Sequence, residues 1–442
     1  MKSIIIISLI LCYFLPQAVL AGRNLTAESN ATVRIAFGSC LQPYLQPDPV
    51  LNKITESNPD VFAWLGDVAY TDAIRIGNRG IAMSPFVKFV GAEKYRAKLE
   101  ETKNLSSYQR LRNKTQIVGV WDDHDYGIND GDISFKEKEI TQPIWLDFID
   151  EPADSPRRKQ KGIWDSYYIG KEQQIKLILL DSRYYKSGGR FSGNDTLGHI
   201  QWEWLENQLK NSKAELVLIA NGYQILPDDR FIPETWFYES REKLYDLINK
   251  YRVNGVVFMS GDVHIGEIMR NPCSKPRIGY DLYEITSSGI THTVFGPLRY
   301  FTEAWMPPTY DTRVDNMYID LNFGIIDVNF TNGHIANISL QIRNRQGDIV
   351  REQILPYSSL IRNEKVIGGH ENCSIYLESP ASRLFKYHLS HLSNLSSTKG
   401  KIGVLMYLAA IGILLMELMI LYRIVRWCCR RKKSLGKKEK PE

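Results

Sequence analysis

The chain of 442 residues has little cysteine and lacks the glycine-rich motifs of the common nucleotide-binding and serine-hydrolase folds. No GxGxxG, Walker A or GxSxG pattern occurs, so dinucleotide binding, P-loop chemistry and serine-hydrolase chemistry have no support. No stretch combines the central glycine and closing glutamate of a calcium-binding EF-hand loop. The sequence also has no internal repeat and no low-complexity tract. These absences favour an ordinary globular domain whose chemistry is assembled from scattered residues.

Long hydrophobic runs are confined to the two ends of the chain. Residues 1–21 carry one lysine, an apolar run and a small-residue exit, which is typical of a signal peptide. Residues 401–422 form an apolar run long enough to cross a bilayer, and the tail 423–442 is basic. This pattern predicts a single-pass type I membrane protein of the secretory pathway (endoplasmic reticulum, endolysosome or cell surface). Its domain of residues 22–357 would be luminal or extracellular, with a polar stalk at 358–400.

Net positive charge is confined largely to the tail, although the whole chain has a formal net charge of +5. Counted from the sequence, residues 22–400 carry a net charge of −3, so no nucleic-acid partner is expected. The predicted partners are a phosphate-ester substrate, membrane lipid among the candidates, and the bilayer itself. N-x-[ST] sequons predict glycosylation on the luminal side, at Asn24, Asn30, Asn104, Asn113, Asn194, Asn329, Asn337, Asn372 and Asn394.

Between the ends, apolar β-branched runs alternate with helical patterns. The predicted strands are 32–37, 61–65, 115–121, 175–180, 215–220 and 255–259. The predicted helices are 49–56, 85–100, 199–209 and 241–251. Asn332-Gly333 is typical of a two-residue hairpin turn between two further strands. The alternation predicts an α/β fold in which helices cover a sheet.

Each of the six predicted strands runs into polar residues that can bind metals or phosphate. They are Cys40, the pair Asp67 and Tyr70, the run Asp122-Asp123-His124-Asp125, the run Asp181-Ser182-Arg183, Asn221, and the pair Asp262 and His264. Functional sites of α/β folds lie beyond the carboxyl ends of the strands, so we expect these groups to converge. Because several anionic ligands raise one another's pKa values unless a cation lies among them, the convergence predicts bound metal.

Some of these residues have a purely structural interpretation. Residues Asn129, Asp130 and Asp132 fit a solvated turn better than a site. Taken alone, Cys40 fits a small buried hydrophobic residue, and Asp181 with Arg183 fits an internal ion pair as well as a phosphate contact. The mixture of carboxylates with softer ligands favours iron, zinc, manganese or calcium in combination over a lone structural zinc.

At these residues the sequence resembles the PhoD-like (alkaline phosphatase D) branch of the metallophosphoesterases. The resemblance covers roughly residues 32–345, and its motifs are FGSC (37–40), GDVAYTD (66–72), VWDDHDYG (120–127), LLDSRYY (179–185), QWEWLENQL (201–209) and SGDVH (260–264). It implies a four-layer sandwich of two β-sheets flanked by helices, with a bimetal site. Two departures are WDDHD in place of the commoner WDDHE, and no separate β-sandwich domain ahead of FGSC.

The resemblance also implies roles for individual residues. A first, iron(III)-type site would use Cys40, Asp67, Tyr70 and His264. Asp67 would bridge to a second, divalent metal (calcium, zinc or manganese), completed by Asp123, Asn221 and Asp262. His124 would act near the phosphoryl oxygen or the leaving group, with Asp125 setting its tautomer, and Arg183 would bind the phosphate.

With Cys40 taken as a ligand, two luminal cysteines remain, and we predict a disulfide between Cys273 and Cys373; two buried free thiols are the alternative. The function expected from the resemblance is hydrolysis of phosphodiesters by attack of a metal-bound hydroxide on phosphorus. Phosphomonoesterase activity is the alternative within the enzymes. A non-catalytic, metal-stabilised receptor or adhesion domain is the alternative outside them.

Overall fold

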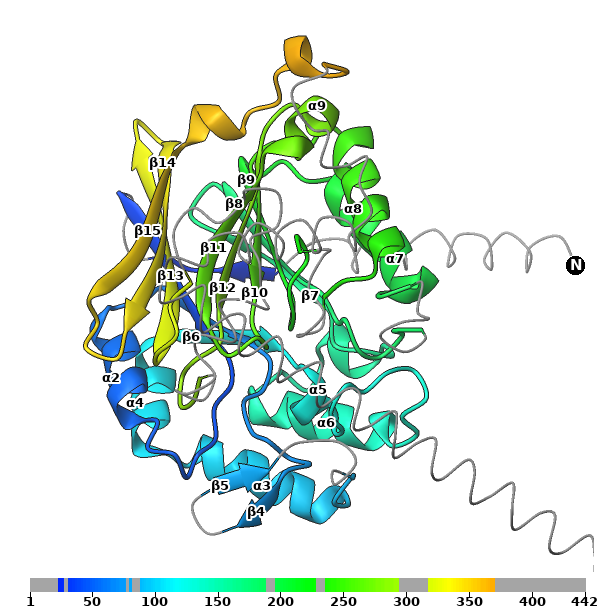
Figure 1. Ribbon diagram of the computed structural model, residues 1–442, viewed down its shortest axis with the longest axis vertical. Helices are drawn as coiled ribbons and strands as arrows, with labels where there is room; N and C mark the ends of the chain where they lie inside the picture. The colour runs from blue at the N-terminus through cyan, green and yellow to red at the C-terminus, as the bar shows by residue number, and fades with distance from the viewer. Residues whose placement is uncertain are drawn as a thin grey trace, which may run out of the picture. The chain divides into compact units, whose positions relative to one another are not determined.

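The computed structural model (Figure 1) describes residues 23–27, 31–76, 79–81, 88–187, 195–227, 235–293 and 317–369. Two β-sheets flanked by helices form the core, which confirms the predicted α/β fold at this level. The predicted signal peptide, transmembrane helix and basic tail lie outside the described residues.

The six-stranded sheet has the order β15-β14-β13-β2-β3-β6. Its strands are β2 (Thr32–Gly38), β3 (Val61–Leu65), β6 (Gln116–Val120), β13 (Asn322–Thr331), β14 (His334–Asn344) and β15 (Ile349–Pro356). Strands β2, β3 and β6 are parallel, so their carboxyl ends share one edge. The turn between β13 and β14 is formed by Asn332 (φ 53°) and Gly333 (φ 83°), which confirms the predicted hairpin turn.

The seven-stranded sheet has the order β1-β7-β8-β9-β10-β12-β11. Its strands are β1 (Arg23–Leu25), β7 (Asp165–Ile169), β8 (Ile175–Leu179), β9 (Leu216–Ala220), β10 (Val256–Ser260), β11 (Gly266–Asn271) and β12 (Leu282–Ser287). Strands β8, β9, β10 and β12 are parallel. Every residue of β8, β9 and β10 except one lysine is apolar or small, and all are buried, as expected for parallel strands covered on both faces.

Helices cover the outer sides of both sheets and the ends of their strands (Figure 1). They are α2 (Asp48–Glu56), α3 (Ala92–Lys103), α4 (Ser106–Lys114), α5 (Asp123–Tyr126), α6 (Lys138–Phe148), α7 (Gly198–Lys210), α8 (Tyr238–Lys250) and α9 (Lys275–Ile278). A two-stranded pair, β4 (Ile74–Ile76) with β5 (Arg79–Ile81), stands apart. Helix α3 begins at Ala92 and not at the predicted residue 85, because Gly91 has a φ of 89° that a right-handed helix does not accommodate.

The end of the described chain packs onto the domain. Short 3₁₀ turns cover Tyr357–Leu360 and Glu364–Val366. The Leu360 side chain is fully buried, and its carbonyl accepts the backbone N–H of Gly255 at 2.9 Å. Residues 358–369, which the sequence assigned to a stalk, therefore belong to the folded domain.

Candidate metal centre

The candidate centre lies where the carboxyl ends of the parallel strands of both sheets meet. Cys40 follows β2, Asp67 follows β3 and Asp123 follows β6 in one sheet; Asn221 follows β9 and Asp262 follows β10 in the other. The structure thus brings together residues that are up to 220 positions apart in the chain, as expected for sites at strand ends.

The two sheet edges approach too closely at this point for ordinary side chains. A Cβ atom on Gly222 would lie 2.5 Å from the carboxylate carbon of Asp122, which belongs to the other sheet's strand end. A Cβ atom on Gly261 would lie 2.6 Å from the carbonyl oxygen of Leu65. Because real Cβ atoms do not come this close to backbone, glycine at these positions is what allows the edges to meet.

Four of the converging side chains are carried on left-handed backbone. The φ angles are 62° at Cys40, 53° at Asp67, 68° at Asp262 and 57° at His264. For a residue with a Cβ atom this conformation costs on the order of 1–2 kcal/mol. Such backbone is concentrated at functional sites, where the surrounding packing holds it in place. Each turn aims its side chain back toward the meeting point of the sheets.

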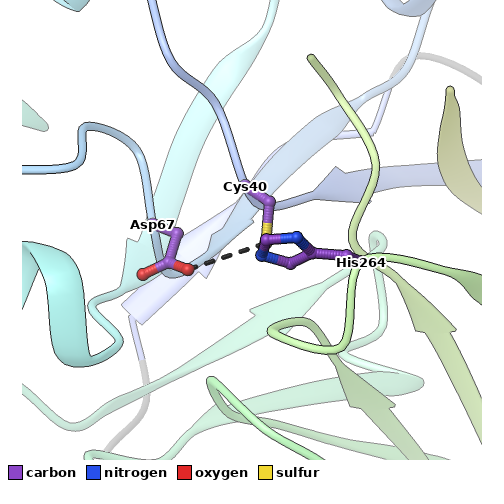
Figure 2. Close-up of side chains that lie close together, drawn as sticks. All are labelled: Cys40, Asp67 and His264. Carbon is purple, nitrogen blue, oxygen red and sulfur yellow. Dashed lines mark hydrogen bonds between the residues drawn. The ribbon is translucent and has the colours of Figure 1, made fainter. Parts of the chain in front are cut away.

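One group of potential metal ligands consists of Cys40, Asp67 and His264, whose ligand atoms all lie within 4.8 Å of one another. Figure 2 shows the three side chains pointing toward one another from three separate loops. The Cys40 Sγ atom lies 3.6 Å from Asp67 Oδ2. The Tyr70 hydroxyl lies 3.0 Å from His264 Nε2, which adds a phenol to the same group.

Two further groups adjoin the first. One consists of Asp67, Asp123 and His124, and the other of Asp122, Asp123 and Asp262, with ligand atoms again within 4.8 Å of one another. Asp67 is common to the first group and its neighbour, and Asp123 is common to the other two. A shared carboxylate is the arrangement by which two metals are held a few ångströms apart.

The electrostatics of these groups favour a cation. Burial, followed by the charges of Asp123, Asp122 and Asp125, raises the pKa of Asp67 well above its usual value. Burial and then the charge of Asp67 likewise raise the pKa of the Cys40 thiol. Within the described ranges, no hydrogen-bond donor reaches the buried Oδ1 atom of Asp67. A bound metal would supply the missing partner and the missing positive charge, so the residues fit a metal centre.

His124 is held by Asp72, not by Asp125 as the sequence suggested. The Asp72 Oδ1 atom lies 2.7 Å from His124 Nδ1, and Asp72 Oδ2 accepts the backbone N–H of Asn129 at 2.7 Å. Asp125 is fully buried and accepts the Asp67 backbone N–H at 2.9 Å and the Trp145 indole N–H at 2.9 Å. Its role is to hold the turn that carries Asp67.

The charge balance at His124 favours the imidazolium. Burial lowers the pKa of His124, but the charges of Asp123, Asp72 and Asp67 outweigh this effect, and the pKa ends well above its usual value. In turn, burial raises the pKa of Asp123, and the charges of His124 and Arg183 overcome it to give a pKa of about 2. His124 and Asp123 thus form a charged pair within the site.

The prediction that Arg183 contacts phosphate is corrected by its position. The Arg183 side chain is fully buried, and its Nε atom donates to Asp122 Oδ1 at 2.5 Å. Asp181 Oδ1 accepts the backbone N–H of Arg183 and the Trp121 indole N–H, both at 2.9 Å. The structure thus shows an internal ion pair, but Arg183 pairs with Asp122 and not with Asp181, which was the partner in the alternative interpretation.

Asn221 is fully buried and fixed by a tryptophan. Its Oδ1 atom accepts the Trp236 indole N–H at 2.8 Å, and within the described ranges its Nδ2 atom has no hydrogen-bond acceptor. A buried amide N–H without an acceptor costs about 1–3 kcal/mol, so a ligand oxygen that accepts it would be stabilised. Oδ1 has a second lone pair, which is the one available to a metal.

Two residues near the centre, Asp72 and His292, escaped the sequence analysis, and Asp122 was noticed there only as part of a run. Asp72 closes the GDVAYTD motif and Asp122 opens WDDHD, so both were quoted without a role. His292 follows the unpredicted strand β12, whose end SSGITHT is as polar as the six strand ends that were noticed. The missing signal was the strand itself, because three of the six residues of β12 (Glu284, Thr286 and Ser287) are polar and interrupt its apolar pattern.

Other predicted sites lie away from the centre. Cys273 is buried, and its predicted partner Cys373 lies outside the described residues, so the disulfide stays a prediction. Among the predicted glycosylation sites, Asn30, Asn194, Asn372 and Asn394 also lie outside them. The exposed sequon asparagines are Asn24, Asn104 and Asn113, whereas Asn329 and Asn337 are half-buried and joined by a 2.9 Å hydrogen bond. Glycosylation likewise stays a prediction.

Two sheets flanked by helices, with clustered acids and softer ligands at the carboxyl ends of parallel strands, define a metal-dependent phosphoric ester hydrolase. The chain belongs to the PhoD-like phosphatase family, whose model matches residues 35–337. The predicted family is thereby confirmed, and the chain is an enzyme of this class and not a non-catalytic receptor or adhesion domain. The metals themselves are addressed below as a proposal.

Individual known proteins are similar over smaller parts of the chain. The human protein named cyclic GMP-AMP phosphodiesterase SMPDL3A (Homo sapiens) is 29% identical over 158 residues, which are 34% of this chain and 34% of that protein. The bovine protein of the same name (Bos taurus) is 28% identical over 159 residues, again 34% of each chain. The match thus spans about a third of the length of these curated relatives.

Among solved structures, one titled "Structure of PhoD" is similar in fold. The TM-score is 0.57 at 14% sequence identity, and the match covers 84% of this chain and 78% of that one. At this identity the likeness concerns the fold alone. It agrees with the two sheets and their flanking helices.

The predicted single-pass type I topology and secretory localisation are corrected. In the part of the chain that the structure describes, no helix is both long enough and apolar enough to cross a membrane. The segments on which the prediction rested, 1–21, 401–422 and 423–442, lie outside the described residues.

Proposed function

We propose that the chain hydrolyses phosphodiesters at a bimetal centre bridged by Asp67. The observation that carries the proposal is that the Asp67 carboxylate belongs to two adjoining groups, each able to hold a metal ion. Asp67 is also 1% exposed, has a raised pKa and has one oxygen that no donor reaches within the described ranges. A carboxylate in this condition needs a cation on each side.

The ligand chemistry separates the two positions. The first position combines a thiol, a phenol, an imidazole and a carboxylate, which suits an iron(III)-type ion; these are Cys40, Tyr70, His264 and Asp67. The second combines oxygen ligands, which suits calcium, zinc or manganese. Asp67 groups with Asp123, and Asp123 groups with Asp262; Asn221 is added to the set by the family resemblance. Metals at both positions would activate a water molecule and stabilise the charge that develops on the phosphoryl oxygens.

His124 supplies the proton that a diester needs. A nitrogen of His124 lies within 4.8 Å of carboxylate oxygens of Asp67 and Asp123, so the ring borders both proposed metal positions. Asp72 engages Nδ1 at 2.7 Å, which leaves Nε2 to face the substrate. The raised pKa keeps the imidazolium populated near neutral pH. It can then donate its Nε2 proton to the departing alkoxide, a strong base that leaves poorly without one.

Preference for diesters is supported by the names of the curated relatives, which are cyclic GMP-AMP phosphodiesterases matched over a third of their length. Phosphomonoesters are the alternative substrate class. The two classes differ in charge, because a monoester dianion carries one more negative charge than a diester and binds the metals more strongly.

The first prediction concerns activity of the purified full chain on bis(4-nitrophenyl) phosphate and on 4-nitrophenyl phosphate. We expect faster hydrolysis of the diester, loss of hydrolysis with a chelator, and a fall in kcat of roughly 10³-fold or more for Asp67→Asn. The matched control is Asp348→Asn, at an exposed position in the turn between β14 and β15. It should retain the wild-type rate.

The substrate class and the bimetal centre would be contradicted by different results. Hydrolysis of the monoester alone would overturn the substrate class but not the centre. Full activity of Asp67→Asn, or activity indifferent to a chelator, would overturn the bimetal assignment itself.

A further inference from the structure

His292 enters the centre from a strand end that none of the proposed ligands uses. It lies five residues beyond the end of β12, whose neighbour β10 carries Asp262. The backbone N–H of Thr291 donates to the carbonyl of Cys40 at 3.3 Å, and that of Ile290 donates to the carbonyl of Ser39 at 3.3 Å. These contacts tie the segment before His292 directly to the turn that carries Cys40.

The His292 ring faces the same phenol as His264. Its Nε2 atom lies 3.0 Å from the Tyr70 hydroxyl oxygen, and His264 Nε2 lies 3.0 Å from that same oxygen. The centroids of the two imidazole rings are 4.5 Å apart, with their planes at 90°. Two nitrogens and one phenol oxygen thus meet at a single point, and one of the two rings, His264, also belongs to the group with Cys40 and Asp67.

Thr291 determines which His292 nitrogen carries the proton. The Thr291 hydroxyl accepts the Gln42 backbone N–H at 2.9 Å and donates its only proton to the Cys40 carbonyl, 3.0 Å away. Its oxygen is also 3.0 Å from His292 Nδ1. Because the hydroxyl proton is already used, this contact requires an N–H on Nδ1. In neutral His292 the lone pair is therefore on Nε2, toward Tyr70.

The contact between His292 and Tyr70 then depends on the phenol proton. While Tyr70 is a phenol, its hydroxyl can donate to His292 Nε2 and accept an N–H from His264 Nε2. If Tyr70 binds metal as the phenolate, the contact with His292 Nε2 has no proton. The lone pairs can converge at these distances when they share a cation.

We propose that His292 Nε2 is a further nitrogen ligand of the first metal position, beside His264, and that the Thr291 hydroxyl orients it. The inference rests on the proposed bimetal centre and extends it. A second imidazole favours a transition metal over calcium at this position, because calcium prefers oxygen ligands and imidazole suits iron, zinc and copper.

The test uses Co²⁺ as the probe, added to the chelator-stripped full chain and followed by its visible absorption. We expect His292→Ala to weaken Co²⁺ binding at the first position by about 100-fold and to change the absorption spectrum. Free imidazole should restore both, because it can occupy the space left by the side chain. The matched control is His334→Ala, whose side chain is 81% exposed at the hairpin turn, and it should bind as the wild type does.

A second variant keeps the test decisive if His292→Ala does not fold. Thr291→Val retains the imidazole but removes its orienting acceptor, and it should weaken Co²⁺ binding by roughly 10-fold. Wild-type affinity and an unchanged spectrum in His292→Ala would overturn the proposal; so would wild-type behaviour of Thr291→Val where His292→Ala cannot be purified.

The failure of this inference is distinguishable from failure of the proposed function. If the wild type binds no Co²⁺, or if Asp67→Asn binds it normally, the bimetal centre is wrong. If Asp67→Asn loses binding while both His292→Ala and Thr291→Val keep it, only the role of His292 is wrong.

Discussion

At the scale of single residues, Asp72 has the clearest effect on chemistry because its two oxygens hold two different parts of the site. Oδ1 meets His124 Nδ1 at 2.7 Å, and Oδ2 accepts the Asn129 N–H at 2.7 Å. The solvated turn that follows WDDHD thus serves the site through its backbone, since the Asp130 N–H likewise donates to Asp123 Oδ2 at 2.6 Å. Side chains there remain half-buried or exposed.

The second prediction is that Asp72→Asn lowers kcat by about 10²-fold, within the range of general acid catalysis. Removing the Asp72 charge should also lower the pKa of His124, because that charge is among the causes that raise it. As the pH rises, activity that depends on the imidazolium would then be lost at a lower pH than in the wild type. The pH–rate profile measures this, with Asp348→Asn as control. An unchanged alkaline limb would contradict the role of Asp72.

The third prediction concerns Lys176, which lies on β8 and is 1% exposed. Its Nζ donates to the Gln208 carbonyl at 3.0 Å, and burial lowers its pKa to about 8. Between about pH 8 and the ordinary lysine value of about 10.4, the unfolded chain holds a proton that the folded chain has lost, so stability rises with pH. The size of the effect over this whole pH range is on the order of 3 kcal/mol, at about 1.4 kcal/mol per pKa unit.

We therefore expect Lys176→Met to remove that rise in the free energy of unfolding, measured in urea between pH 7 and pH 9.5. Lys210→Met is the matched control, because Lys210 is exposed at the end of α7. Equal pH slopes in the wild type and Lys176→Met would show that Lys176 is not the cause.

At the scale of elements, the turns that follow the strands, more than the strands themselves, position the side chains of the centre. Gly66 precedes Asp67 with a φ of 85°, and a Cβ atom there would lie 2.3 Å from the Cβ of Asp122. Gly333 in the hairpin turn has a φ of 83°, and nothing lies within 4 Å of where its Cβ would be. The two glycines share a backbone conformation and differ in the space around them.

The fourth prediction compares Gly66→Ala with Gly333→Ala. Both incur about 1 kcal/mol for left-handed backbone, but Gly66→Ala adds an overpacking cost of about 1–3 kcal/mol and displaces Asp122. Urea unfolding should show the larger loss for Gly66→Ala, and Co²⁺ titration should show weakened binding for that variant alone. Equal losses, with equal metal binding, would refute the close approach of the two sheet edges.

At the scale of the whole domain, the centre joins the two sheets through charge. Asp67 and Asp123 come from one sheet and Asp262 from the other, so without a cation their repulsion acts across the junction. Metal binding is thus coupled to the stability of the folded domain, since a ligand at 100 times its Kd stabilises by about 2.7 kcal/mol.

The fifth prediction is that a chelator lowers the Tm of the wild-type chain by several degrees, on the scale of roughly 2–4 °C per kcal/mol for a domain of this kind. Asp67→Asn should show little further decrease, because its centre is already disrupted. Thermal unfolding of both proteins with and without chelator measures the difference. A wild-type Tm that the chelator leaves unchanged would mean that no metal joins the sheets.

The sequence alone determined the buried strands and the polar residues at their ends. Strands such as β8 and β9 are short apolar runs, and such runs can be recognised from residues that are adjacent in the chain. Asn332-Gly333 predicted its turn for the same local reason. The assignment of ligands to each metal came only from the family resemblance. Positions along the chain do not give the distances between loops in space.

Only the tertiary structure decided which side chains face one another. The family resemblance implied Asp125 as the partner of His124, whereas the packing of the β3 turn against α5 selects Asp72. Arg183 is placed behind Asp122 by the buried contacts of Asp181, and His292 reaches Tyr70 because β12 ends at the same edge as β10. Contacts of this kind join residues far apart in the chain, and their geometry arises from the packing of two sheets.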